Sequence, residues 1–380
     1  TGRPRYIAPL GTGAQLNYVL GGTRPSYVTQ PGIVSGDLTW TKPRTIGFGI
    51  EIGALDNRLL FSYDWFQRTI FDEVGVAEQL PVVLGTSPPA KNNAVSETRG
   101  WEVSAEWRDM AFEIGGDQIN YGIKLYMSDY IGYVVEYTDN ISGSRSGWTP
   151  GQRFGVVYGY ESAGIQTSAQ DLQDNVLYNN GWFHPGDLLF KDTNGDGRIN
   201  SGDGGYWYSE GDRTELGYNY PRYKYGATLS AGWKGLNLRV LLDGVGHQVI
   251  YSNNKFTTGV THIGSRGLLD FHGKLGYWTM DNHDSFFPRL YRNTKNFNIA
   301  NDQYMQDLAH LRVKNINLSY TLPKSLIKWQ SIDNLSVNLS IENALMIYDK
   351  SWPEFDPQFL RYSTYPPSRI FAFGVKVDLN

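Results

Sequence analysis

Residues 371–379 read Phe-Ala-Phe-Gly-Val-Lys-Val-Asp-Leu, so that every second side chain is large and apolar. Residues 337–342 (Val-Asn-Leu-Ser-Ile-Glu) repeat this alternation, and residues 236–243 (Leu-Asn-Leu-Arg-Val-Leu-Leu-Asp) largely follow it. Because the side chains of a β-strand point alternately to its two faces, each segment has one apolar and one polar face. A strand with one face in lipid and the other in water needs this pattern. The segments therefore predict an all-β, antiparallel transmembrane β-barrel.

Nine segments alternate in this way, and each fits the thickness of a bilayer. We expect strands at 43–54, 58–70, 95–108, 118–129, 222–233, 236–247, 307–322, 333–345 and 369–379. Short turns are expected at 55–57, 108–117, 234–235 and 323–332. Long loops are expected at 71–94, 130–221, 248–306 and 346–368, and residues 1–42 belong to a further outside loop. Short periplasmic turns and long outside loops are typical of outer-membrane barrels, and they predict a periplasmic C-terminus.

The alternation assigns a lipid-facing row to each strand. On the first five strands it comprises Ile46, Phe48, Ile50 and Ile52; Leu59, Phe61, Tyr63 and Trp65; Trp101, Val103, Ala105 and Trp107; Ile119, Tyr121, Ile123 and Leu125; and Ala227, Leu229, Ala231 and Trp233. The opposite faces include Glu51, Asp64, Glu102, Glu106 and Lys124, as a hydrated lumen would. The alternative is a half-buried sheet over a soluble core. In segment 307–322 the alternation changes phase, which predicts a bulge or an extension above the membrane.

The composition of the 380-residue chain agrees with a barrel. It contains 43 Gly, 26 Tyr, 11 Trp and no Cys, and aromatic residues make up 14 %. This density of Trp and Tyr fits the aromatic girdles of a barrel. No apolar run approaches the ~20 residues of a membrane-spanning helix. The net charge of −4 and the absence of a basic cluster with interleaved aromatics argue against a nucleic-acid partner.

Nine strands with two open edges would leave unpaired backbone groups in hydrocarbon, each costing several kcal/mol. An odd number of strands with an outside N-terminal segment also contradicts a complete barrel. We therefore expect the chain to be the C-terminal portion of a larger barrel that is surrounded by outer-membrane lipid.

Residues 192–203 match the calcium loop of an EF-hand. The predicted ligands are the side chains of Asp192, Asn194 and Asp196, the Arg198 carbonyl, Asn200 and Asp203. Gly197 occupies the sixth position, where the backbone turns sharply, and Ile199 at the eighth points inward. Asp203 replaces the usual glutamate, which is expected to weaken binding. No helical pattern flanks the loop, so we predict a structural Ca²⁺ within loop 130–221; the alternative is a polar turn without an ion.

Further segments resemble a known family. Leu38-Thr39-Trp40-Thr41-Lys42, the segment Lys191-Asp192-Thr193-Asn194-Gly195-Asp196-Gly197, and Asp212-Arg213-Thr214 followed by Pro221-Arg222-Tyr223-Lys224-Tyr225-Gly226 occur in the family's order. Residues 311–323 (Leu-Arg-Val-Lys-Asn-Ile-Asn-Leu-Ser-Tyr-Thr-Leu-Pro) and Asp356-Pro357-Gln358 continue it. With these motifs the chain resembles the C-terminal part of a SusC/RagA-like TonB-dependent (TonB-linked) outer-membrane transporter.

The resemblance implies a 22-strand barrel, of which this chain is roughly the last two-fifths. A plug domain and a TonB-binding segment would lie upstream, together with the N-terminal remainder of the same barrel. The family imports oligosaccharides or peptides, usually under a SusD-like surface lipoprotein, with energy supplied through TonB.

The first functional hypothesis is active import of an oligosaccharide or peptide nutrient, with aromatics of the outer loops holding the ligand. The candidate contacts are Trp148, Tyr158, Tyr160, Trp182, Tyr206, Trp207, Tyr208, Tyr251, Tyr277, Trp278, Tyr348 and Trp352. The alternative for each is a packed loop aromatic or a contact with the lipoprotein. A second hypothesis is a surface glycan-binding or adhesin protein stapled by Ca²⁺ that does not transport. No zinc-protease, nucleophile-elbow or phosphate-loop motif is present, so we predict no catalytic residues and no enzymatic activity.

Overall fold

The computed structural model describes most of the chain. The described residues are 11–13, 19–29, 33–75, 89–138, 148–168, 183–202, 211–251, 276–289, 299–327, 329, 331–348, 356–357 and 367–379. Among them, no helix combines the length and the apolar character that crossing a membrane requires.

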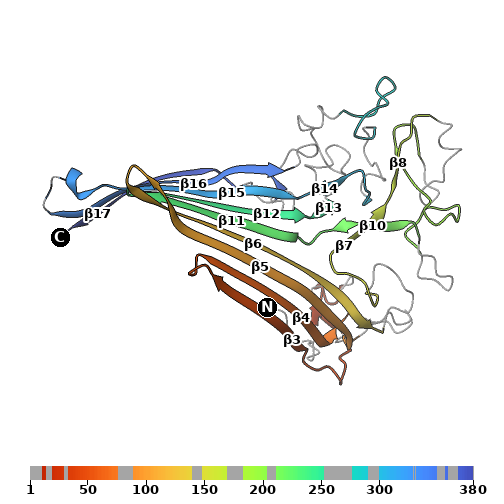
Figure 1. Ribbon diagram of the computed structural model, residues 1–380. Coiled ribbons are helices and arrows are strands. Elements are labelled where there is room, and N and C mark those ends of the chain that lie inside the picture. Colours follow the sequence, from red (N-terminus) through yellow and green to blue (C-terminus); the bar gives the residue numbers. More distant parts are fainter. Residues whose placement is uncertain are drawn as a thin grey trace.

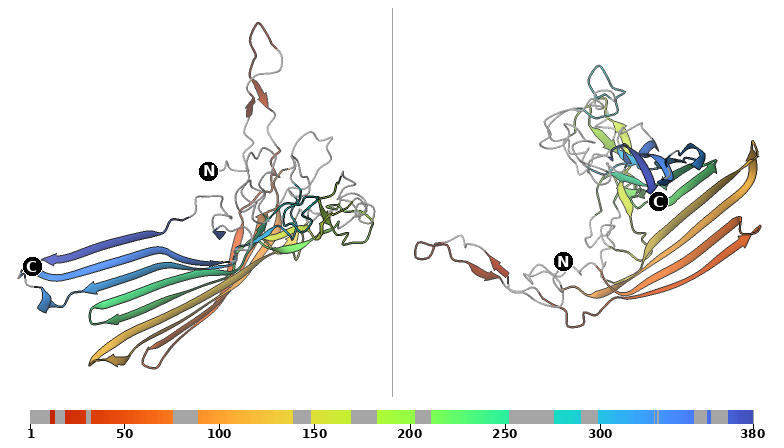
Figure 2. Two further views of the ribbon diagram at one scale, coloured as in Figure 1. Left: turned by 90° about the horizontal axis from the view of Figure 1, so that it is seen from above. Right: turned by 90° about the vertical axis from the view of Figure 1, so that its left-hand side faces the viewer.

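The main element is a nine-stranded antiparallel sheet in which neighbours along the chain are neighbours in space (Figure 1). Its strands are β3 (Lys42–Ala54), β4 (Leu59–Val74), β5 (Asn92–Ile114), β6 (Asp117–Tyr137), β11 (Arg222–Trp233), β12 (Leu236–His247), β15 (His310–Thr321), β16 (Ile332–Tyr348) and β17 (Ile370–Leu379). The sheet is curved, and β3 and β17 form its two edges (Figure 2). All nine segments predicted to be strands are thus confirmed as strands, in the predicted order along the chain.

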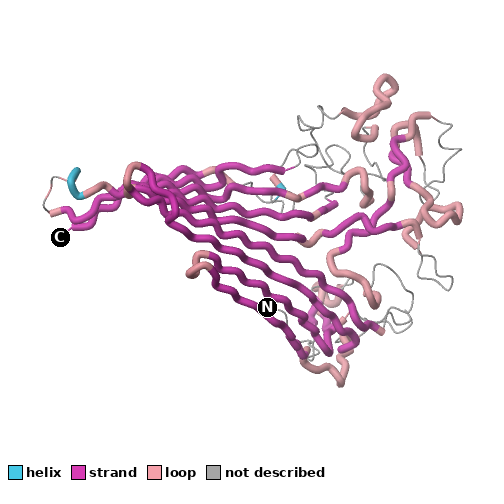
Figure 3. Tube along the Cα trace, viewed as in Figure 1, coloured by secondary structure: helices cyan, strands magenta, loops and turns pink. Residues whose placement is uncertain are grey.

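Most of the shorter strands gather at one end of the sheet, and tight turns lie at the other (Figures 1 and 3). The strands at this end are β7 (Val156–Tyr160) paired with β10 (Arg213–Tyr218), β8 (Ser162–Ile165) with β9 (Leu188–Phe190), and β13 (Val249–Tyr251) with β14 (Met305–Asp307). A further hairpin of β1 (Gly11–Gly13) and β2 (Tyr27–Thr29) projects away from these strands (Figure 2). One 3-10 helix, η3 (Lys324–Leu326), lies in the turn before β16. The predicted asymmetry between long loops and short turns is confirmed.

Strands β5 and β6 are longer than predicted. The expected turn at 108–117 shrinks to Gly115 and Gly116, whose φ angles of 62° and 85° suit a two-residue hairpin turn. At the other end β5 and β6 still pair at Ala94 and Tyr137. Bulges between Val95 and Ser96 and after Asp109 interrupt the alternation, and for this reason the pattern understated both strands.

The register aligns the predicted lipid-facing rows across the whole sheet. Directly paired residues of antiparallel strands point to the same face. One such row crosses all nine strands: Ala54, Leu59, Trp107, Ile123, Leu229, Val240, Ile316, Ile341 and Phe371. Every member is apolar. The parallel rows on this side give one continuous apolar face, which we call the apolar belt.

The other face of the sheet is polar. The row one residue away from the apolar row contains Arg108, Gly122, Ser230, Arg239, Asn317 and Ser340. The belt is not a closed core, because its side chains remain exposed: 57 % for Phe48 and 67 % for Phe371. The buried apolar residues of the described chain lie instead at the loop end of the sheet. A half-buried sheet over a soluble core is therefore wrong.

The phase change in segment 307–322 is a bulge, the first of the two predicted explanations. Leu241 and Leu242 of β12 pair with Asn315 and Val313 of β15, which leaves Lys314 as an extra residue. The register between β15 and β16 shifts at the same place, where Asn343 adopts a φ of 52°. Because of the extra residue, the apolar side chains before and after the bulge point to the same face of the sheet, although the sequence alternation changes phase.

We predict that a charge in the belt is far more harmful than one on the polar face. In the intact protein in lipid vesicles, Leu339→Lys should lower the free energy of unfolding by about 2–4 kcal/mol, because the ammonium would lie in hydrocarbon. Asn338→Lys, one residue away on the polar face, is the matched control and should change it little. Guanidinium titration measures both, and equal effects would contradict the assignment of faces.

Candidate functional site

The apolar belt ends at the loop end of the sheet with charged side chains. Alternate residues on this face of β5 run from Trp101 to Arg99 and Glu97, and the β6 partner of Trp101 is Asp129. Arg222 donates two hydrogen bonds of 2.6 Å to the Asp129 carboxylate, and only 12 % and 6 % of these two side chains are exposed. Such a bidentate, charge-assisted pair is strong where water is scarce. It marks the outer border of the belt.

The opposite border is aromatic. The Trp107 indole donates to the Tyr121 hydroxyl over 3.2 Å. The Lys234 ammonium lies 5.3 Å from the centre of the Trp233 ring and forms a 2.7 Å ion pair with Asp117. Trp and Tyr at this level, with lysine just beyond, are typical of a membrane–water interface. The belt therefore has a border at each end of the strands.

At the loop end, two long connections fold together into one body, which we call the outer cap. It comprises described residues 148–221 and 248–309. Its buried core is formed by Tyr160, Leu188, Phe190, Ile199, Phe287 and Tyr304. The first four come from the connection between β6 and β11 and the last two from that between β12 and β15. Neither loop is an independent arm, because each supplies part of a shared core.

Polar contacts inside the cap reinforce this core. Arg289 donates to Asp187 over 2.9 Å, and Asp187 is 2 % exposed. The Tyr304 hydroxyl donates to the Phe286 carbonyl over 2.8 Å. Burial raises the pKa of Tyr304 and raises that of Tyr277 to about 12, so both phenols are neutral at physiological pH.

The predicted ligand-contacting aromatics are mostly packed within the cap. Tyr160 and Trp278 are buried, and Tyr251 and Tyr277 pack against the core. Trp148 lies between Tyr137 and Phe154 in a second small cluster, while Tyr158 and Tyr348 are half-buried. Trp182, Tyr206, Trp207, Tyr208 and Trp352 lie outside the described residues. The structure thus shows a packing role for Trp148, Tyr160, Tyr251, Tyr277 and Trp278, and ligand contact stays a prediction for all twelve residues.

The predicted calcium loop is folded around its own side-chain oxygens. The Asp192 carboxylate accepts the amides of Gly195 and Gly197 over 2.7 and 2.9 Å. Asn194 Oδ1 accepts the amide of Asp196, whose carboxylate accepts the amide of Arg198. Each of these oxygens keeps a lone pair, so the donor set fits a hard cation. Among the described residues no three acidic or histidine side chains converge as a metal cluster.

The eighth and ninth positions of the loop tie it to the cap. Ile199 is 1 % exposed and belongs to the shared core, so the prediction that it points inward is confirmed. The backbone N–H of Asn200 donates to the Asp212 carboxylate over 2.8 Å, and the backbone carbonyl of Asn200 accepts the backbone N–H of Asp212 over 2.9 Å. Asp203, the predicted twelfth ligand, lies outside the described residues.

Asp212 is the residue that sequence reasoning missed. Its side chain is fully buried, and its two oxygens accept the amides of Thr193 and Asn200 over 2.9 and 2.8 Å. It therefore closes the loop from the segment just before β10. The signal for it was the adjacent Asp212-Arg213-Thr214 motif, but the motif follows the twelfth position of the loop by nine residues.

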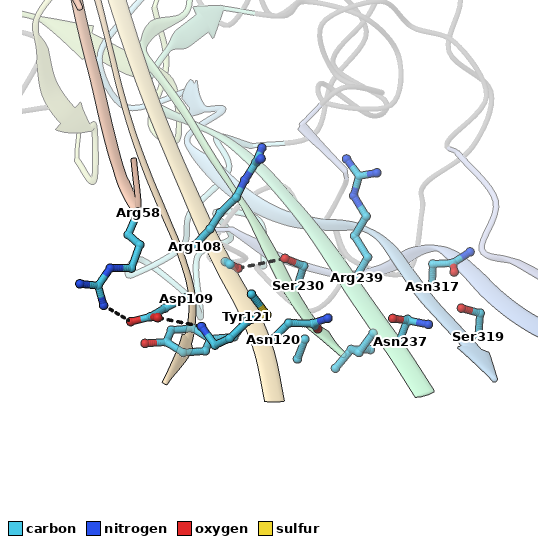
Figure 4. A pocket seen from close by; sticks show the side chains of 14 residues that line it. Arg58, Arg108, Asp109, Asn120, Tyr121, Ser230, Asn237, Arg239, Asn317 and Ser319 are labelled. Carbon is cyan, nitrogen blue, oxygen red and sulfur yellow. Dashed lines mark hydrogen bonds and ion pairs between the residues drawn. The ribbon is translucent and has the colours of Figure 1, made fainter. Parts of the chain in front are cut away.

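The polar face holds a pocket near the turns (Figure 4). Its volume is about 550 Å³, and Arg108, Asn120, Ser230, Asn237 and Arg239 are among its lining residues. Figure 4 shows Arg108 and Arg239 projecting to the same side, with Ser230 between them. No prediction from the sequence singled out this group, because its members lie on four different strands.

Comparison with known proteins gives matches over almost the whole chain. TonB-dependent receptor P3 of Formosa agariphila is 22 % identical over 410 residues, which cover 99 % of this chain and 38 % of that protein. TonB-dependent receptor SusC of Bacteroides thetaiotaomicron is 23 % identical over 375 residues, or 92 % and 33 % of the two chains. A solved structure, the RagAB peptide transporter, superposes with a TM-score of 0.70 at 20 % identity, covering 98 % of this chain and 38 % of the other. No protein-family model matches.

The chain is similar to SusC/RagA-like TonB-dependent receptors. The predicted resemblance is thereby confirmed, and the fold is confirmed as part of an antiparallel β-barrel like that of RagA. The chain spans 38 % of the length of receptor P3. The activity, the substrates and the partners of the whole protein are therefore matters for proposal.

We predict that Asp212 holds the loop closed. Asp212→Asn should replace an accepting oxygen with a donor facing an amide and should open residues 192–202 locally. Losing a hydrogen bond to a charged group costs about 1.5–3 kcal/mol, so amide hydrogen exchange at Thr193 and Asn200 should accelerate by roughly 10–150-fold. Asp281→Asn, at an exposed cap position, is the control. Unchanged exchange at both amides would refute this role.

Proposed function

We propose that this chain forms part of the wall of an outer-membrane barrel that imports an oligosaccharide or peptide. The observation that carries the proposal is the apolar row crossing nine strands beside a polar row one residue away. One face suits hydrocarbon and the other suits a water-filled passage. The remaining strands, the plug and the TonB-binding segment belong to segments outside this chain, and its C-terminus lies in the periplasm.

The comparisons support transport rather than catalysis. The curated relatives are named TonB-dependent receptors, and the solved neighbour is named a peptide transporter. We infer coupling to TonB and a SusD-like lipoprotein resting on the outer cap. A cap with a shared core offers such a partner a firm surface, since both long loops contribute to it.

We further propose that loop 192–203 binds Ca²⁺ as a structural ion. Asp192, Asn194 and Asp196 would supply side-chain oxygens, Arg198 its carbonyl, and Asn200 and Asp203 the remaining positions. The ion would neutralise the carboxylates of a loop whose eighth residue anchors it in the cap core. Its role is to clip the cap together.

Uptake distinguishes an importer from a surface binder. Cells that carry the intact gene should accumulate a labelled oligosaccharide or peptide, and a protonophore should abolish this accumulation, because TonB draws on the proton gradient. An adhesin would leave the label outside with or without the protonophore. Label that stays at the surface under both conditions would contradict import.

Calcium removal should loosen the cap and spare the barrel. In the presence of a chelator, or in Asp196→Ala, trypsin should cleave after the exposed Arg198 at least about tenfold faster, while the resistance of the barrel to heat in detergent stays the same. Asp281→Ala is the matched control. Equal cleavage with and without chelator would exclude the calcium clip.

A further inference from the structure

The polar face carries a group of charges that strand pairing places together. Arg108, Gly122, Ser230 and Arg239 form one cross-strand row on β5, β6, β11 and β12. Three strand spacings of about 4.8 Å separate the two arginines, or about 14 Å between their Cα atoms. Between them Gly122 has no side chain and Ser230 a small one, so these two residues form a floor. Both arginines project over the same side of it (Figure 4).

The adjoining row adds Glu106, Lys124 and Thr228, and together the two rows line a basin of about 460 Å³. We call it the basic basin. Gly122 keeps its floor open, because a Cβ there would lie 2.8 Å from Ser230 Oγ.

The basic basin has an excess of positive charge. Its charged lining residues are Arg108, Lys124 and Arg239 against Glu106, a net charge of +2. Glu106 accepts a hydrogen bond from Arg108 and lies 3.7 Å from the Lys124 ammonium. Arg239 forms no ion pair with any described residue. With no acidic partner in the described part of the chain, the guanidinium of Arg239 can bind an anion that reaches this face.

We propose that the basic basin binds a carboxylate group of the transported solute. The guanidinium fork of Arg239 matches a carboxylate in two parallel hydrogen bonds, and Arg108 faces it across the small-residue floor. The solute is then an acidic oligomer, either a uronic-acid oligosaccharide or a peptide with acidic side chains. This inference rests on the proposed import function and names its substrate class.

The test measures binding to the purified intact protein by calorimetry. Two matched pairs of probes are used: tri-galacturonate with its methyl ester, and tri-glutamate with tri-glutamine. One acidic probe should bind at least about tenfold more tightly than its neutral partner. Arg239→Gln should remove this preference, and raising the salt concentration should reduce it. Arg239→Lys, which keeps the charge but not the fork, should restore part of it.

Lys376→Gln is the control, because it removes a positive charge from the polar face of β17 outside the basin. Unaltered heat resistance in detergent verifies that each variant is folded. The proposal is overturned if neither acidic probe is preferred, or if Arg239→Gln leaves the preference unchanged. It is also overturned if Arg239→Gln only destabilises the protein, because the arginine then pairs with an acidic group of the protein itself. These results are independent of the uptake assay, so failure of import and failure of the basin are distinguishable.

Discussion

The structure depends on backbone hydrogen bonding under a strict register. Within hydrocarbon each unpaired N–H or C=O costs several kcal/mol, so a strand is stable there only when both neighbours satisfy it. The register that pairs the backbone also decides which side chains share a face. A shift of one residue between β5 and β6 would place Lys124 opposite Trp107 and turn it toward lipid. Backbone hydrogen bonding and the partitioning of side chains between lipid and water therefore favour the same register.

The same constraint explains how much of the fold could be predicted from the sequence. Period-two alternation arises from the two solvents on the two faces of each strand, so all nine strands were identifiable with no knowledge of their contacts. The turn end of β5 was not, because the bulge after Asp109 interrupts the alternation. The loop end of β6 was not either, because beyond Asp129, the partner of Trp101, the outward face meets water, as Arg99 and Glu97 on the neighbouring β5 indicate. Where both faces are wet, alternation no longer distinguishes a strand from a loop. The irregularity at Lys314 could be located because it changes the phase of an otherwise regular pattern, but the phase alone did not distinguish a bulge from an extension above the membrane.

The candidate site was less accessible to prediction, for a different physical reason. The EF-hand-like motif is local, so Asp192, Asn194 and Asp196 could be named as candidate ligands from spacing alone, and calcium binding itself stays a prediction. Asp212 accepts a hydrogen bond from the same loop although it lies twelve residues after Asn200 in the sequence, and no local spacing rule specifies that contact. Likewise, Tyr160 and Phe287 share one core although they are far apart in sequence. Aromatic density indicated rings in the loops but not whether those rings face a ligand or one another.

The bulge between β15 and β16 helps to attach the loop between β16 and β17 to the sheet, through contacts of Arg312. Arg312 on the polar face of β15 is 4 % exposed and donates to Asp356 over 3.2 and 3.0 Å and to Asn343 Oδ1 over 3.2 Å. Asn343 is the residue whose left-handed backbone forms the bulge in β16. Without the bulge, Asn343 would continue the regular register and its side-chain oxygen would not point toward Arg312. These acceptors matter for a buried guanidinium, since removing one partner leaves a desolvated charge. They serve the two terminal nitrogens of Arg312, whereas its Nε has no hydrogen-bond partner among the described residues. The irregularity in the strand is thus the means by which a charge on the wall holds a segment of the following loop.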